Sequence, residues 1–197
     1  MSTTVWMAIG VAVVVVFWAA AVHNRLRQLR NRVDNAFAQI DVQLKRRHDL
    51  IPNLVEVARG YMAHESSTLE AVARARGQAA QAAAHARRHP GQAAAMASLA
   101  GAEAALGSSL GQLMVLTESY PDLKADAQMQ SLSEEITSTE NRLGFARQAY
   151  NDQVLDFNDQ AAQFPAIVVA RLLGFPTAPM LESTRSDEER AAPKVQF

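Results

Sequence analysis

The chain has 197 residues, which suits one domain of ordinary size together with a membrane anchor. Its 19 basic and 20 acidic residues nearly cancel, so the charge balance gives no overall attraction to nucleic acid or to an anionic surface. Cysteine is absent, which excludes disulfides, thiolate metal sites and a cysteine nucleophile. Glycine and proline are scarce while helix-forming residues abound, and we therefore expect an all-α fold.

The first predicted element is a transmembrane helix over residues 5–22, preceded by a short N-terminus, 1–4. No charged residue interrupts these 18 residues, and at 1.5 Å per residue they would extend about 27 Å, close to the thickness of the bilayer hydrocarbon. Trp6 and Trp18 lie toward the two ends, where indole rings favour the membrane interface. A cleaved signal peptide is the alternative, but the start of the chain lacks the basic residues of such peptides.

A cluster of arginines follows this apolar segment directly. Because positive charge beside a span favours the cytoplasmic side, we expect a short N-terminus outside and the rest of the chain in the cytoplasm. The alternative is a domain on the opposite, periplasmic side. We also expect these arginines to contact the headgroups of membrane lipids. They are Arg25, Arg27, Arg30 and Arg32.

Apolar residues at three- and four-residue steps over 26–44 predict that the membrane helix continues outward as one rod. Pro52 lacks an N–H and crowds the preceding turn, so a kink or short break is expected near 49–52. Ser67 and Glu70 have the spacing of a capping box, which would start a second helix reaching Ala86 if the chain turns there; a bend without a break is equally compatible.

The sequence Arg87-Arg88-His89-Pro90-Gly91 predicts a chain reversal. A third helix follows, with leucines at positions 99, 106 and 113 repeating every seven residues. Gly107 and Gly111 lie one turn apart on it, and we expect them to allow close packing within the bundle.

A long fourth helix is predicted from residue 125 to 164, after Tyr120-Pro121-Asp122 ends the third. Its apolar residues recur every seven positions, which is the pattern of a coiled-coil seam. We expect the seam to be a packing or interaction surface. Its members are Met129, Ile136, Leu143, Tyr150, Phe157 and Phe164. Asn151 and Asn158 sit beside the seam at equivalent places of a near repeat, where polar residues usually fix register or hydrogen-bond across helices.

Residues 166–175 form a short apolar segment whose helix should stop at Gly174. It is too short to span a bilayer, so docking on the bundle is the first expectation, with a second membrane contact or a subunit interface as alternatives. Residues 182–197 are charged and predict a disordered tail. The helical domain would then occupy 23–181.

No catalytic or cofactor-binding pattern is found. His64-Glu65 begins like the HExxH zinc motif, but Thr68 stands where the second histidine is required. The Gly-x-Ser-x-Gly, phosphate-loop and dinucleotide motifs are missing too. Basic clusters without interleaved aromatic residues do not favour nucleic acid as a partner. We therefore expect that the chain is not an enzyme and that it binds neither a metal nor a cofactor.

With these segments laid out, the chain resembles the LemA family of bacterial membrane proteins. The resemblance is carried by residues 30–65, 117–126 and 140–175. It implies an N-terminal anchor followed by an elongated antiparallel bundle of about four helices, at the bacterial inner membrane with the short N-terminus outside. It names no biochemical activity.

The combined expectation is a membrane-anchored, non-enzymatic scaffold or interaction module that self-associates as a homo-oligomer or docks other envelope proteins. An adaptor or regulator of a membrane-bound protease is the alternative, and a hydrolase with an unrecognised site is the least favoured.

Overall fold

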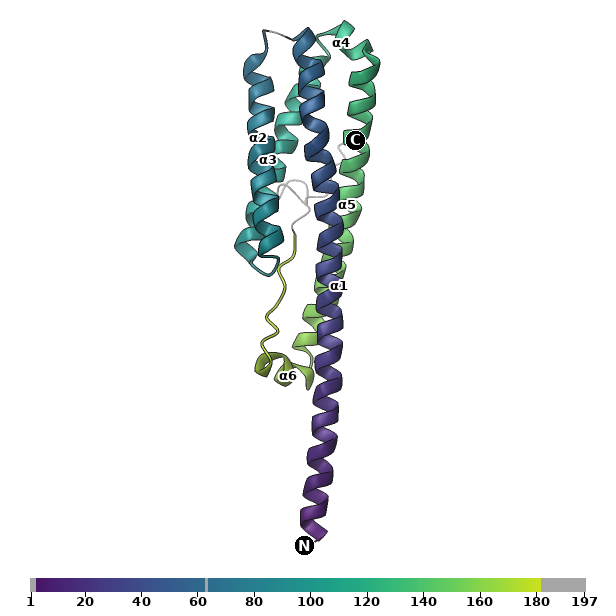
Figure 1. The fold of residues 1–197 in the computed structure, drawn as a ribbon, viewed down its shortest axis with the longest axis vertical. Coiled ribbons are helices and arrows are strands. Elements are labelled where there is room, and N and C mark those ends of the chain that lie inside the picture. The colour runs from purple at the N-terminus through teal and green to yellow at the C-terminus, as the bar shows by residue number, and fades with distance from the viewer. Residues whose placement is uncertain (1–2, 63, 182–197) are drawn as a thin grey trace, which may run out of the picture.

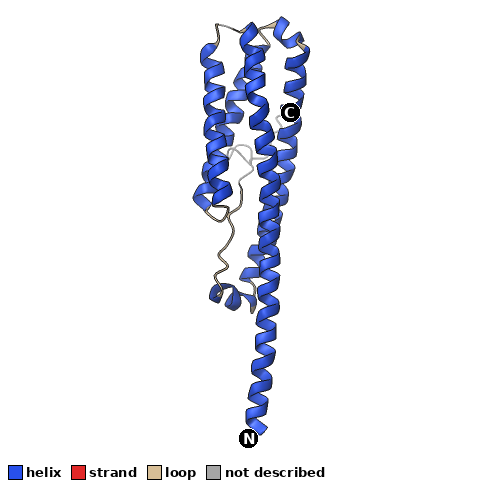
Figure 2. Ribbon diagram, in the orientation of Figure 1, coloured by secondary structure: helices blue, strands red, loops and turns tan. Residues whose placement is uncertain are grey.

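The computed structural model describes residues 3–62 and 64–181, and in this part of the chain every regular element is a helix (Figures 1 and 2). Four long helices run alternately up and down, and two short ones lie at the two ends of the bundle. The predicted all-α architecture is confirmed. The helices are α1 Thr3–Tyr61, α2 Ser66–Arg88, α3 Ala93–Thr117, α4 Pro121–Ala125, α5 Ala127–Ala162 and α6 Ala166–Leu172. The predicted tail, 182–197, lies outside the described residues.

Helix α1 is the axis of the molecule. Its 59 residues correspond to a rod about 90 Å long at the standard helical rise. The N-terminal part projects beyond all other elements and has no buried residue before Leu26 (Figure 1). It is apolar and long enough to cross a membrane. Helix α3 is also long and apolar enough, but it is partly buried and packs against α2 within the bundle.

The core has two parts along the axis. In the part farther from the N-terminus, α1, α2, α3 and α5 enclose one apolar cluster that includes Leu54, Leu106 and Ile136. In the nearer part the tip of the α2–α3 hairpin still contributes to the second cluster. Beyond this tip, α6 and the extended segment 175–181 lie beside α1 and α5 (Figure 1). We call this extended segment the strap. Ala178 and Leu181 of the strap are buried in the second cluster.

Pro52 lies inside α1 and does not break it, so of the kink or short break expected near 49–52 the break is absent. A proline at this position leaves the carbonyl of His48 without its helical N–H partner. The side chain of Arg76 on α2 fills that vacancy, because its Nε donates a hydrogen bond of 3.0 Å to this carbonyl oxygen. The chain turns instead after Tyr61, and Ser67 lies inside α2 without capping it. The capping-box prediction is therefore wrong.

Two further expectations are corrected by the packing. Gly111 is exposed, with open space where a Cβ would lie, so it does not mediate close helix packing. Phe164 is 85% exposed and lies outside the seam, because α5 ends at Ala162 and Pro165 cannot continue the helix. At its other end α5 begins at Ala127, after Asp126 has accepted hydrogen bonds from the first turn of the helix.

Candidate functional site

The arginines after the apolar segment divide into two groups. Arg25, Arg27 and Arg32 are exposed. Arg30 turns back onto the bundle, where its guanidinium lies over the ring of Phe157 and near Asp34. Arg25 and Arg27 are only three and five residues beyond the apolar segment, about 5–8 Å along the helix axis. These two are the best placed of the four to meet a membrane surface.

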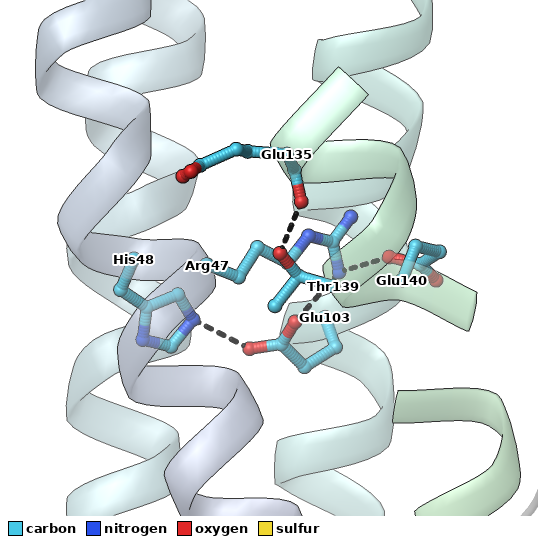
Figure 3. A network of polar contacts seen from close by, with 6 residues as sticks. All are labelled: Arg47, His48, Glu103, Glu135, Thr139 and Glu140. Atoms are coloured by element: carbon cyan, nitrogen blue, oxygen red, sulfur yellow. Dashed lines mark hydrogen bonds and ion pairs between the residues drawn. The ribbon is translucent and has the colours of Figure 1, made fainter. Parts of the chain in front are cut away.

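A buried charged cluster joins α1 to α3 (Figure 3). Glu103, which is 2% exposed, lies between two cationic or polar groups of α1. Nη1 of Arg47 is 3.1 Å from Oε2 of Glu103, and Nε2 of His48 is 2.8 Å from Oε1. Both carboxylate oxygens are thereby occupied. Because an uncompensated charge is very costly in a bundle interior, this pairing fixes the register between the two helices.

The same arginine reaches a third helix. Nη1 of Arg47 lies 2.8 Å from Oε2 of Glu140 on α5, which is only half-buried. One guanidinium thus ties α1, α3 and α5 together (Figure 3). The residues of this cluster bind one another across the three helices. Our sequence reasoning missed it, although a single acidic residue in an otherwise apolar, uncharged helix was a usable signal.

Asn151 and Asn158 bind the backbone of the strap, not a neighbouring helix. Oδ1 of Asn158 accepts from the N–H of Ala178 at 2.8 Å, and its Nδ2 donates to the carbonyl of the same residue at 3.0 Å. Asn151 makes the same pair of bonds with Leu181, at 2.9 and 2.8 Å. The hydroxyl of Tyr150 adds a bond of 2.8 Å to the carbonyl of Pro179.

The repeat in α5 explains this spacing. Two asparagines seven residues apart are separated by about 10.5 Å along a helix. Three residues of an extended, proline-containing strap cover about 9.3 Å. The distance between the two asparagines along α5 therefore nearly matches the distance between Ala178 and Leu181 along the strap. Asn158 binds the earlier of these two strap residues and Asn151 the later one, so the strap runs antiparallel to α5. Both asparagine side chains bind only main-chain atoms of the strap. They therefore fix the position of its backbone and do not depend on which side chains it carries.

The seam lies inside the bundle. Five of its six members are buried: Met129, Ile136, Leu143, Tyr150 and Phe157. They pack against α1 and are covered on that side. The hydrophobic side chains left exposed on α5 are elsewhere, at Phe145 and Leu155.

Two tyrosines tie the end of the bundle that is farthest from the N-terminus. The hydroxyl of Tyr61 donates to Asp126 at 3.0 Å, and that of Tyr120 donates to Glu65 at 3.3 Å. Hydrogen bonds from the backbone of Met129 and from Tyr61 lower the pKa of Asp126. The contact with Asp126 in turn raises the pKa of Tyr61. Both bonds link loops and support the fold.

An open depression is present on the outer face of α5, lined by Thr137, Asn141 and Phe145 among others of the same helix. Within residues 3–62 and 64–181, no three His, Asp or Glu side chains come together in a way that could hold a metal ion. His64, considered above for zinc, is exposed in the loop between α1 and α2.

The LemA family model matches residues 36–197, most of the chain. The chain belongs to the LemA family. Among its relatives are the magnetosome proteins MamQ 2 and MamQ 1 of Paramagnetospirillum magneticum, each 24% identical over 189 residues, covering 87% of this chain and 70% of the relative. Protein LemA of Metamycoplasma hominis is 25% identical over 150 residues, covering 76% of this chain and 64% of that protein. The predicted family is thereby confirmed.

Proposed function

We propose that this LemA-family chain is a membrane-anchored scaffold: a rigid helical bundle held at a fixed orientation to the bilayer by one transmembrane helix. The observation that carries the proposal is the continuity of α1. The same helix that projects bare and apolar at its N-terminus becomes the central element of the bundle core. No flexible linker separates anchor from domain, so the membrane would fix the direction in which the bundle points.

The exposed apolar residues of 5–22 support the anchor, because side chains such as Val14 and Phe17 have no protein neighbour to cover them. We place the span in the bacterial inner membrane. The exposed Arg25 and Arg27 favour a cytoplasmic bundle and a short N-terminus outside, and they would lie among lipid headgroups.

A non-enzymatic role is supported by how the polar residues of the core are used. Arg47, His48 and Glu103 pair with one another, and the asparagines beside the seam bind the strap. The names of the MamQ relatives associate them with magnetosomes. A part in organising a membrane assembly is consistent with those names.

Self-association and docking of other envelope proteins belong to the same proposal. Since the seam is buried, contacts between copies would use exposed positions such as Phe145 on α5, Val42 on α1 or Val115 on α3, each more than half exposed. The chain has no cysteine, so a single cysteine introduced at one of these positions would be the only thiol in this chain.

A bifunctional maleimide applied to intact membranes tests this. We expect a covalent dimer from at least one of Phe145→Cys, Val42→Cys and Val115→Cys. Asp152→Cys, at an exposed polar position of α5, is a further site. Whether it also crosslinks shows how far a contact at Phe145 extends along the helix. Monomer alone from every variant, with no adduct to another protein, would contradict the scaffold role. Release of the chain by a carbonate wash would contradict the anchor.

A further inference from the structure

An apolar stripe is exposed on and around α6. Phe164, Val168 and Leu172 follow one another at steps of four residues, and Leu173 adjoins the last of them. Val168 is 49% exposed and Leu172 79%. A step of four places Val168 and Leu172 on one face of α6, while Phe164 precedes the helix and Leu173 follows it. All four side chains are apolar, and the described part of the chain leaves them exposed.

The opposite face of α6 fixes this orientation. Ala166, Val169 and Ala170 are buried, and α6 packs against both α1 and α5. Gly174, with a φ of 70°, ends the helix, and the N–H of Phe175 bonds back to the carbonyl of Ala170. The short helix is thus seated on the bundle from one side, and its stripe is presented outward.

The position of α6 along the axis is the decisive observation. The ring of Phe175 lies 5.4 Å from the ring of His23, which follows the apolar segment of α1 directly. Val22, the last residue of that segment, packs against the same core cluster as Phe175. Figure 1 shows α6 crosswise at the level where α1 leaves the bundle, with the rest of the bundle on the side away from the N-terminus.

The exposed charges of α6 and of the first turns after the span are cationic, and the acidic residue nearest to α6 in the chain is Asp159 on α5. Arg171 on α6 and Arg25 and Arg27 on α1 are exposed. No acidic residue occurs before Asp34 or between Gln160 and Leu181. An apolar helix face whose one charged residue is Arg171, level with the arginines that follow the span, matches the boundary between acyl chains and anionic headgroups.

We propose that α6 lies in the membrane interface, with Phe164, Val168, Leu172 and Leu173 inserted at the headgroup boundary of an anionic bilayer beside the span. The inference rests on the proposed transmembrane anchor. A bilayer fits the stripe better than a second copy of the chain does, because the stripe lies level with the end of the span, where Arg25 and Arg27 of α1 and Arg171 of α6 are exposed. Two points of attachment would stop α1 from tilting or rotating freely.

The test uses the full chain in vesicles of phosphatidylcholine and phosphatidylglycerol. One cysteine per variant carries an environment-sensitive nitrobenzoxadiazole dye, and the lipids carry a nitroxide quencher either near the headgroup or deep in the acyl chain. The stripe sites are Leu172→Cys and Phe164→Cys. The anchor site is Val14→Cys. The matched control is Phe145→Cys, an exposed aromatic position on α5.

We expect emission from the two stripe sites to shift to shorter wavelength and to be quenched more by shallow than by deep nitroxides. Val14→Cys should be quenched more by deep nitroxides, and Phe145→Cys by neither. Quenching at Val14 without quenching at either stripe site would overturn the inference and leave the anchor standing. Absence of quenching at Val14 would instead overturn the anchor. A blue shift at the stripe sites that lipid nitroxides leave unquenched would mean that protein covers the stripe, which also overturns the inference.

Discussion

Nε of Arg76 donates a hydrogen bond of 3.0 Å to the carbonyl oxygen of His48, across the interface between α2 and α1. That carbonyl is the one that Pro52 leaves without a helical donor. His48 also uses its side chain, which binds Glu103 on α3. One residue of α1 is therefore held by α2 through its main chain and by α3 through its imidazole, and the proline is compatible with an unbroken helix.

Replacing Arg76 by leucine should lower the free energy of unfolding by about 1–3 kcal/mol, the cost of a carbonyl left without a donor. Pro52→Ala restores an N–H to α1, so the same Arg76→Leu change should cost less in that background. Chemical denaturation of the full chain in detergent, followed by circular dichroism, measures both values. Equal costs in the two backgrounds would contradict the pairing of this carbonyl with the arginine.

Replacing Glu103 by alanine should lower the unfolding free energy by about 3 kcal/mol or more, because Arg47 would keep only its half-buried partner on α5. Glu134→Ala is the control, since this glutamate is exposed on α5, and it should change stability by less than about 0.5 kcal/mol. The same denaturation measurement applies. A small effect at Glu103 would show that the buried cluster does not hold the helices in register.

Replacing Asn158 by alanine removes both hydrogen bonds to Ala178 and should expose the strap. Hydrogen exchange followed by mass spectrometry should show faster exchange of the amides of Ala178 and Leu181, with little change in α3. Asn141→Ala, at an exposed site of the same helix, should leave the strap protected. Unchanged protection in the Asn158 variant would mean that apolar contacts alone hold the segment.

Ionisation of Tyr150 should destabilise the fold at high pH. Burial raises the pKa of this phenol from 10 to about 12, although nearby Arg30 opposes the shift. The folded state therefore retains the proton where the unfolded state has lost it, so stability is full below pH 10 and declines as the pH rises toward 12. Tyr150→Phe should show a shallower decline over that interval. A phenolate absorbance titration that assigns Tyr150 an ordinary pKa would contradict the argument.

The helices could be predicted because their signals are local. The seven-residue spacing of leucines predicted α3, and the apolar residues that recur every seven positions from Met129 onward predicted α5. Of the kink or short break predicted near Pro52, the break is absent for a physical reason: a donor from a distant helix replaces the lost N–H, and one helix's own sequence cannot reveal a donor on another. Phe164 was misplaced because the heptad pattern continues past the residue at which proline ends the helix.

The partners of the polar residues could not be predicted in the same way. The repeat of Asn151 and Asn158 was visible in the sequence, but their target is a segment 20 or 30 residues later in the chain. A pattern of period seven does not distinguish a neighbouring helix from an extended strap of matching rise. The exposed stripe at α6 was visible only as an apolar segment, since its distance from the end of the span depends on the tertiary structure.

The most direct test of the account is the distance between anchor and bundle. Spin labels on a Val16→Cys, Val42→Cys variant, both at exposed positions of α1, are measured by double electron–electron resonance in lipid bilayers. A continuous helix predicts a narrow distribution centred at about 39 Å, given 1.5 Å per residue. A broad distribution, or one centred at a much shorter distance, would show that anchor and bundle are separate bodies, which contradicts the account.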